Sequence, residues 1–445
     1  MGAASTAAAL LLALLTAQQA TAAVLDASTA TISAASTSAS TVKVNARSKS
    51  KSKSKAFDSA LWNSCIPPDA ESAPGHFVDA AIRMGLGARE VARRRRISEF
   101  VAQVPKAELH VHIEGTLEPE LMLALAKRNG LPPPYPSMEA AKKAYKFKDL
   151  QSFLDLYYKG ASVLRKSQDF YDLAWAYFKK AAHANVTRVE YFFDPQTHLG
   201  NGLPWVTFME ALEMAAQDAK AEFGLDAVPV MCFLRDQPPA SAAAVLAESA
   251  PYRHFLVAAG LDSAEKGNPP ARFKTVMDAA RAEGLRVVAH AGEEGPAAYV
   301  WDALNLLHAD RIDHGIHSVD SPAVMEYLAE RQVGLTICPL SNVKLQVMGG
   351  KGDLKDALTQ LFDPDNNLAA TINSDDPAYF GGYINANYEW AGCALGLNIT
   401  DLARAARSSF AASFMTPADK QAAIERVAEV ERRFLSREAG EEAAL

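Results

Sequence analysis

The hydrophobic pattern of this chain changes period again and again between residues 104 and 434. Short β-branched or apolar runs alternate there with longer amphipathic stretches of helical period. Eight strands alternating with helices predict an α/β fold of the (β/α)8 TIM-barrel class. The predicted strands are residues 107–113, 186–193, 227–234, 255–261, 286–290, 311–315, 333–338 and 368–373, and helical segments include 169–184, 205–223, 270–283 and 321–331.

The rest of the chain divides into three further parts. Residues 1–56 combine a short apolar stretch, a small-residue pattern at 20–22 and an acid-poor, Ser/Thr/Ala-rich segment that ends in alternating Lys and Ser. This predicts a disordered leader that acts as a secretory or organellar (plastid or mitochondrial) targeting segment, with an inert tail as the alternative. Residues 57–103 are expected to form a helical extension that covers the barrel bottom or contributes to a homodimer, and residues 435–445 a C-terminal tail.

The charge balance bears on the class of partner. The net charge is −7 and the pI is near 5.9, whereas nucleic-acid binders usually carry a basic surplus. The basic stretches 49–55 and 93–96 are therefore interpreted as a solvated linker and an exposed helix face. Salt-sensitive nucleic-acid binding through them is the alternative. No apolar run reaches the roughly 18 residues that span a bilayer, so no membrane partner is expected.

The four cysteines are scattered along the chain. Cys65, Cys232, Cys338 and Cys393 include no Cys-x-x-Cys pair, so the spacing indicates neither a disulfide scaffold nor a thiolate zinc site. Cys232 and Cys338 lie in apolar runs and are expected to be ordinary buried side chains.

Polar residues stand where the predicted strands end. His110 and His112 close the first strand, His290 the fifth and His314 the sixth, and Asp375 follows the eighth. Barrel enzymes build their sites at this end, and residues two apart on a strand point to the same side. Three imidazoles and a carboxylate suit one zinc ion with a position left open for water. Residues 130–150, with three consecutive prolines, are expected to form part of a loop-helix cap over this mouth.

Each motif alone has an ordinary structural explanation. A His-x-His on a strand is often a pair of plain polar residues, His290 could be a core histidine, and an Asp-Asp-Pro run favours a turn. Their combination at strand ends favours a hydrolytic site, because zinc lowers the pKa of bound water from about 15.7 toward 7. Glu293, His314 and Asp376 would then handle protons or hold the substrate.

Other zinc hydrolases are excluded by what the sequence lacks. It has neither the His-Glu-x-x-His of metalloproteases nor the Pro-Cys-x-x-Cys of cytidine-type deaminases. A two-metal site of this fold would want a bridging lysine at the end of strand four. Lys266 comes too late for that position, so one metal is favoured.

Four motifs give the chain a resemblance to the adenosine and adenine deaminases of the amidohydrolase superfamily. They lie at residues 105–112, 290–293, 313–315 and 374–377, and the resemblance runs from about 105 to at least 388, more weakly to 434. It implies that one zinc ion per subunit is held by His110, His112, His290 and Asp375. It further implies that Glu293 donates a proton, that His314 assists the attacking hydroxide and that Asp376 contacts the purine.

Within that family the chain is more similar to the adenine branch. Glu114 stands where nucleoside-accepting members usually have aspartate, and the longer side chain would intrude on the ribose space. The segment 192–198, with Asp194 as a further substrate-binding residue, is of adenine type, and Glu265 replaces a glycine, which fits a changed pocket. The resemblance thus implies zinc-dependent deamination of adenine to hypoxanthine and ammonia in purine salvage.

Three alternatives stay open. An adenosine deaminase, or one acting on an N6-substituted purine nucleoside or nucleotide, fits the same metal motifs. The leader supports the adenosine reading, because secreted adenosine deaminases carry N-terminal extensions while the family default is cytoplasmic. A zinc-bound binding or signalling protein without turnover is the rival from another class.

Overall fold

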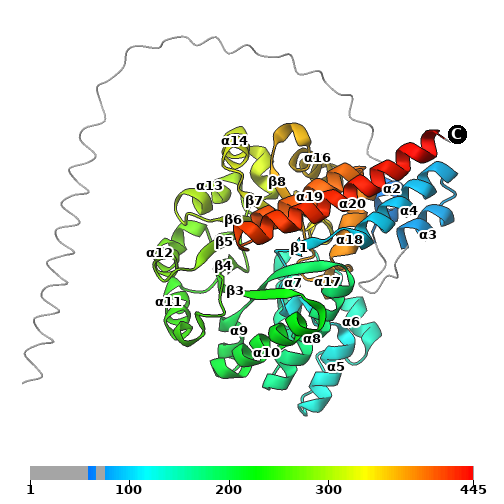
Figure 1. The fold of residues 1–445 in the computed structure, drawn as a ribbon. Coiled ribbons are helices and arrows are strands. Elements are labelled where there is room, and N and C mark those ends of the chain that lie inside the picture. Colours follow the sequence, from blue (N-terminus) through cyan, green and yellow to red (C-terminus); the bar gives the residue numbers. More distant parts are fainter. Residues whose placement is uncertain (1–58, 67–75, 444–445) are drawn as a thin grey trace, which may run out of the picture. The chain divides into compact units, whose positions relative to one another are not determined.

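A computed structural model describes residues 59–66 and 76–443. The predicted leader lies outside the described residues. Eight parallel strands form a single sheet in the order β1 to β8, each paired with its sequence neighbour. The isolated bridge between Val111 and Asp375 brings the last strand back to the first (Figure 1). The strands are β1 Lys106–Glu108, β2 Val186–Phe193, β3 Asp226–Leu234, β4 Ala258–Asp262, β5 Arg286–Ala291, β6 Arg311–His314, β7 Gly334–Ile337 and β8 Ala369–Ile372.

Helices follow the strands and surround the barrel (Figure 1), which confirms the predicted (β/α)8 class. The long helix predicted at 205–223 has those bounds, with Gly224 in left-handed conformation at its end. The helices after the first strand are α5 Pro119–Arg128, α6 Met138–Ala144, α7 Leu150–Ala161, α8 Ser167–His183, α9 Pro195–Gly200, α10 Trp205–Phe223, α11 Pro239–Glu248, α12 Lys274–Ala282, α13 Ala297–Asn305, α14 Pro322–Arg331, α15 Pro339–Lys344, α16 Lys351–Leu361, α17 Pro377–Phe380, α18 Ile384–Trp390, a π-helical turn η6 Ala391–Leu395, α19 Ile399–Ala412 and α20 Pro417–Ala443.

The first strand differs from its predicted bounds of 107–113. Regular pairing ends at Glu108 because the next residues bond in turn to both neighbours. The Leu109 N–H donates to the side chain of Asn373, and the His112 N–H to the Asp375 carbonyl at 3.0 Å. Phe192 and Val111 are joined by a backbone bond of 2.8 Å. This divided pairing joins the histidine segment to both β2 and the end of β8.

The extension before the barrel is helical, as predicted. It contains α2 Ser59–Ser64, α3 His76–Arg83 and α4 Ala88–Gln103. The Lys106 ammonium at the start of β1 donates to the Val101 and Val104 carbonyls at 2.7 and 2.8 Å, which joins α4 to the N-terminal end of the barrel. The rings of Phe100 and Phe434 pack edge to face (Figure 1 shows α4 beside α20). The predicted boundary at residue 434 falls inside α20.

The prediction of an exposed arginine face at 93–96 is wrong for Arg94. Only 2% of Arg94 is exposed, and its guanidinium donates to Glu90 and to the Phe77 carbonyl. Arg93 donates to Glu90 and to the carbonyl of Gly392. Both cations therefore join α4 to α3 and η6. A run of four arginines cannot reveal this, because tertiary contacts decide which side of the helix is buried.

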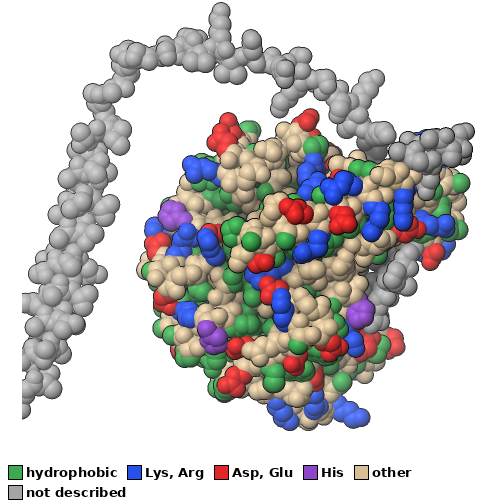
Figure 2. Space-filling model, viewed as in Figure 1, with side chains coloured by type: hydrophobic (Ala, Val, Ile, Leu, Met, Phe, Trp, Pro, Cys, Tyr) green, Lys and Arg blue, Asp and Glu red, His purple; other side chains and the backbone are tan. Residues whose placement is uncertain are grey.

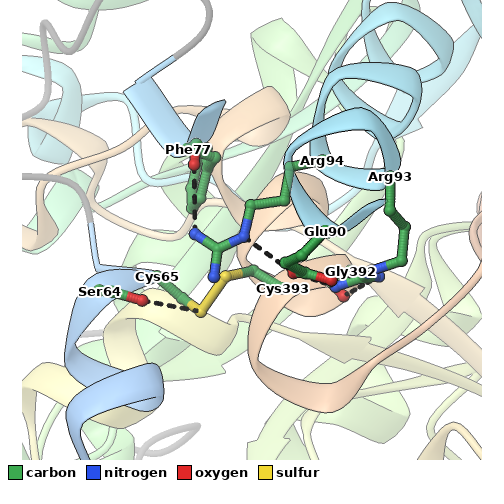
Figure 3. The surroundings of a disulfide bond; sticks show 8 residues. All are labelled: Ser64, Cys65, Phe77, Glu90, Arg93, Arg94, Gly392 and Cys393. Carbon is green, nitrogen blue, oxygen red and sulfur yellow. Dashed lines mark hydrogen bonds and ion pairs between the residues drawn. A yellow bond between two sulfur atoms is a disulfide. The ribbon is translucent and has the colours of Figure 1, made fainter. Parts of the chain in front are cut away.

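A disulfide bond joins the extension to the barrel, contrary to the expectation from cysteine spacing. Cys65 is bonded to Cys393 across 328 residues, with the two Cα atoms 5.7 Å apart (Figure 3). Trp62 packs edge to face on Trp390 beside it. A pairing of this length leaves no local spacing signal, because the fold alone brings α2 against η6. Cys232 and Cys338 are free and buried, as expected.

Among the residues in the described part of the chain, no helix is both long and apolar enough to cross a bilayer. On the face in Figure 2, Lys and Arg side chains are interspersed with Asp and Glu. That mixture does not favour the nucleic-acid alternative.

Candidate active site

Four buried side chains from separate segments converge at the C-terminal mouth of the barrel. His110 and His112 follow β1, His290 belongs to β5 and Asp375 follows β8. One ligand atom from each lies within 4.8 Å of the others. His110 Nε2 is 3.1 Å from Asp375 Oδ1, and the Nε2 atoms of His112 and His290 are 3.2 Å apart. The structure thus brings together the four residues that the sequence assigns to metal.

The chemistry of this cluster fits a divalent cation. Nδ1 of His112 faces Asp262 at 3.6 Å and Nδ1 of His290 faces Asp313 at 3.5 Å. Such partners place the ring proton on Nδ1 and the lone pair on Nε2. Burial also lowers the pKa of His110 and His112, which favours neutral rings. Two Nε2 atoms 3.2 Å apart need either a shared proton or a cation between them, and a cation satisfies both nitrogens at once.

Outer contacts fix the direction of these ligands. Thr336 Oγ1 lies 2.9 Å from His110 Nδ1 and donates to Asp313 Oδ1 at 2.8 Å. The Glu108 carboxylate accepts from the backbone N–H and the hydroxyl of Ser374, and from the hydroxyl of Tyr177 at 2.6 Å. These bonds hold the backbone that leads into Asp375.

The backbone at the site is locally strained. His314 and Asp375 have left-handed φ values of 61° and 64°. Such residues cost on the order of 1–3 kcal/mol each and persist where the surrounding structure enforces them, typically at functional sites. Gly115 is also required, because a Cβ there would lie 1.9 Å from Asp376 Oδ1. The chain therefore tolerates poor local conformations in order to direct these side chains inward.

Three further groups beside the cluster are suited to proton transfer. Glu293 Oε1 is 3.5 Å from His314 Nε2, which lies 3.7 Å from Asp375 Oδ2. Burial, reinforced by the charge of Asp375, holds the pKa of Glu293 well above its usual range. The same two causes raise the pKa of Asp376. Burial lowers the pKa of His314. The mouth therefore holds two carboxyls that favour their protonated form and an imidazole that favours its neutral form.

A second grouping of His314, Cys338 and Asp375 is a poorer metal site. Burial and the charge of Asp375 raise the pKa of the Cys338 thiol well above its usual value, which disfavours the thiolate form. The candidate bridging lysine is also remote. Lys266 is paired with Glu294 and its side chain is 70% exposed. A single metal stays a prediction.

A cavity opens next to the cluster and is lined on one side by α7, which begins where the expected cap of residues 130–150 ends. Beyond the metal and proton-transfer residues, it is lined by Leu150, Phe153, Leu154, Tyr157, Tyr158, Asp194, Asp262, Ser263, Leu345 and Phe380. Within the predicted cap segment, Tyr145 packs on Tyr379 with ring centroids 4.7 Å apart. The cavity is thus lined by carboxyl groups and by aromatic and aliphatic side chains. Such a lining suits a flat, nitrogen-rich ligand.

Asp194 lies on the cavity wall, while Glu114 lies behind it. The Glu114 carboxylate accepts from the Asp194 N–H at 3.1 Å and from the Tyr157 hydroxyl at 3.3 Å, and it pairs with His198 Nε2 at 2.7 Å. It is absent from the lining. Glu114 therefore shapes the cavity indirectly, by holding the lining residues Tyr157 and Asp194 in place. The sequence analysis expected its side chain to enter the ribose space directly.

Two residues of the cavity lining, Asp262 and Tyr157, were not singled out from the sequence. Burial raises the pKa of Asp194 well above its usual range and that of Asp262 to about 6, and the facing carboxyls can share one proton. Tyr157 donates to Asp194 at 3.2 Å. Asp262 stands at the end of β4, a position that could have indicated a site residue. Tyr157 belongs to an amphipathic helix, where nothing separates a lining residue from a core residue.

Comparison with known proteins agrees with this architecture. The family model described as adenosine deaminase matches residues 105–430. An adenine deaminase of Crocosphaera subtropica is 50% identical over 324 residues, which cover 72% of this chain and 98% of that protein. An adenine deaminase of Acinetobacter baylyi is 49% identical over 334 residues, covering 75% and 99%.

Solved structures show the same likeness. The crystal structure of adenine deaminase from Arthrobacter aurescens matches with a TM-score of 0.70 and 42% identity, covering 73% of this chain and 98% of that one. An amidohydrolase from Burkholderia ambifaria with bound Zn matches with a TM-score of 0.72 and 25% identity, covering 85% and 99%.

Proposed function

The chain belongs to the adenosine deaminase family, and on that basis we propose that it is a zinc-dependent adenine deaminase. It would convert adenine and water to hypoxanthine and ammonia. The observation that carries the proposal is the group of three imidazoles and one carboxylate beside His314 and the buried carboxyl of Glu293. Relatives about 50% identical over 72–75% of this chain are named adenine deaminase, which supports the free base as substrate.

Zinc is the metal that this donor set favours. Three neutral imidazoles and a carboxylate are borderline ligands typical of catalytic zinc sites, and the amidohydrolase from Burkholderia ambifaria holds Zn. His110, His112, His290 and Asp375 would hold the ion. When bound, it supplies a water of lowered pKa as the nucleophile.

The remaining side chains move protons and hold the base. Protonated Glu293 donates to N1 of the purine, which makes C6 more electrophilic. Neutral His314 accepts a proton from the attacking water, and protonated Asp376 donates to an acceptor nitrogen such as N7. Asp194 offers a carboxyl oxygen to the imidazole-ring N–H of the free base, a group that a nucleoside lacks. The amino group leaves as ammonia.

The discriminating experiment is ammonia release from adenine and adenosine side by side, with zinc-loaded and chelator-stripped protein. Fast metal-dependent turnover of adenine alone is the expected result. A preference for adenosine would leave the proposed roles of the metal ligands and proton-transfer residues unchanged, but the substrate would then be adenosine. An absence of turnover on either compound and on N6-substituted purines would favour a binding protein.

A further inference from the structure

We propose that Glu265 is a positioning residue that holds the loop carrying Glu293 in its catalytic conformation. The inference rests on the deaminase function proposed above. It replaces the idea that Glu265 reshapes the pocket directly, because its carboxylate is absent from the cavity lining and lies behind the loop that leaves β5.

Four consecutive backbone amides converge on this one carboxylate. Glu265 Oε1 accepts from the Gly292 N–H at 2.7 Å. Oε2 accepts from the N–H groups of Glu293, Glu294 and Gly295 at 3.0, 2.8 and 2.9 Å. Glu265 is only 1% exposed, so little water competes for these bonds. The two oxygens of a carboxyl group supply acceptor lone pairs for these donors, whereas a carboxamide has only one acceptor oxygen.

The loop is shaped around the carboxylate. β5 ends at Ala291 and α13 begins at Ala297, so the four amides are nearly the whole connection. A Cβ on Gly295 would lie 2.5 Å from Glu265 Oε1, so this close approach requires glycine. Gly292 has a φ of +73°, which turns the chain back toward Glu265.

A neighbouring cation fixes the same region from the side of β5. Arg235 Nη1 donates to the His290 carbonyl at 2.5 Å, and its Nε donates to the Asn268 carbonyl. The Asn268 N–H in turn donates to the Glu265 carbonyl at 3.0 Å. The end of β5, the loop and Glu265 therefore form one bonded unit. A small loss of proton-transfer geometry would lower the rate far more than substrate affinity.

The test replaces Glu265 by glutamine, which keeps the shape but directs an NH2 group at a backbone N–H. For Glu265→Gln we expect kcat on adenine to fall at least tenfold, with KM within threefold and metal content unchanged. Asp310→Asn is the matched control. Asp310 also accepts a backbone N–H bond, from Val287 at 2.9 Å, but Val287 lies at the start of β5, away from the loop that carries Glu293. The kcat of Asp310→Asn should stay within twofold of the wild type.

A second variant keeps the test decisive if Glu265→Gln fails to fold. Gly295→Ala pushes the carboxylate away from the amides without changing any charge, and it should reproduce the fall in kcat. Gly200→Ala, where a Cβ meets nothing within 4 Å, is its control. Wild-type kcat in both Glu265→Gln and Gly295→Ala would overturn the proposal.

Hydrogen exchange supplies a readout that does not depend on activity. The amides of residues 292–295 should be protected in the wild type and should exchange at least tenfold faster in Glu265→Gln. Equal exchange in the two proteins would overturn the positioning role. If the wild type released no ammonia from any aminopurine, the proposed function would be wrong. The exchange experiment would still test whether Glu265 holds the loop of residues 292–295.

An independent observation concerns the compartment. From the Cys65–Cys393 bond we infer that the protein matures on the secretory route rather than in the cytosol. Cys65 is fully buried and Cys393 is 5% exposed, and ordered contacts surround the pair (Figure 3). Arg93 donates to the carbonyl of Gly392, the residue before Cys393. The bond therefore belongs to a built interface between α2, α4 and η6.

Such a bond needs an oxidising environment to form and persist. The two thiols lose two protons and two electrons to the disulfide of a protein thiol oxidant, which is reduced to a dithiol. Secretory compartments supply such oxidants, whereas glutathione keeps cytosolic thiols reduced. The disulfide thus argues against a cytosolic protein and agrees with a secretory leader.

The test expresses the full chain with a C-terminal fluorescent tag in eukaryotic cells and labels denatured protein with an alkylating reagent. We expect the chain in the endoplasmic reticulum or medium, with Cys232 and Cys338 labelled and Cys65 and Cys393 recovered as one linked peptide. The free cysteines are the internal control. Retention in the cytosol, a plastid or a mitochondrion, or equal labelling of all four cysteines, would overturn the inference.

Discussion

Glu293 is the residue on which the proposed chemistry depends most directly. Removing its acid proton while keeping its shape should stop the donation to N1, so Glu293→Gln is expected to lower kcat by about 100-fold or more. Metal content should not change, because Glu293 is outside the ligand group. Steady-state kinetics with metal analysis checks both points. A rate near that of the wild type would show that another group donates the proton.

The pH profile gives a second test of the same residue. Burial and the nearby negative charge of Asp375 raise the pKa of Glu293, so its acid form persists to higher pH than that of an ordinary glutamate. An acid donor is lost as the pH rises through its own pKa. The rate should therefore hold across neutral pH and fall on the alkaline side. A profile in which kcat rises steadily with pH would contradict a protonated donor.

Glu114 should influence selectivity through the wall that it supports. Glu114→Asp shortens the side chain and weakens its contacts with His198, Tyr157 and the Asp194 backbone. A looser wall should admit a ribose more readily, so the ratio of kcat/KM for adenosine to that for adenine is expected to rise about tenfold, near the lower end of discrimination by a pocket wall.

The matched control for that prediction is Glu120→Asp, since the ion-pair partner of Glu120 is the remote Lys142. An unchanged selectivity ratio in Glu114→Asp would mean that the wall excludes nucleosides by other contacts.

At the scale of elements, the disulfide should stabilise the docking of α2 on the barrel. It closes a loop of 328 residues, and such bonds typically contribute about 2–4 kcal/mol. Cys65→Ser should therefore lower Tm by roughly 2.5–5 °C in a domain of this size. A reductant should lower the wild-type Tm to the level of the variant and leave the variant unchanged. Equal melting of oxidised and reduced wild type would show that the bond adds no stability.

Periodicity located the strands because a buried parallel strand is a short apolar run whatever surrounds it. The metal ligands could be predicted from the polar residues at strand ends, because barrel topology brings those ends together. Contacts that depend on tertiary packing left no such pattern. The Cys65–Cys393 pairing, the burial of Arg94 and the turn of Glu265 toward the loop after β5 each join segments that the sequence keeps apart.

At the scale of the whole molecule, the barrel mouth concentrates buried acid groups that favour a bound cation. Besides the three ligand histidines it holds Asp194, Asp262, Glu293, Asp375 and Asp376. Burial, and second the charge of Asp375, raise the pKa values of Glu293 and Asp376, which shows that negative charge is costly here. Anything that binds only the folded state stabilises it by mass action, about 4 kcal/mol at a thousand times Kd. The metal should therefore support stability as well as catalysis.

Stripping the metal with a chelator is accordingly expected to lower Tm by roughly 5–10 °C and to abolish turnover, with zinc restoring both. His290→Ala removes a ligand, so its Tm should already be low and should no longer respond to zinc. His183→Ala removes an exposed histidine and should respond like the wild type. Calorimetry with and without zinc measures these shifts. If the chelator abolished activity but left the wild-type Tm unchanged, the metal would contribute to catalysis alone. The folded barrel would then be equally stable without the ion, despite the buried carboxyl groups at its mouth.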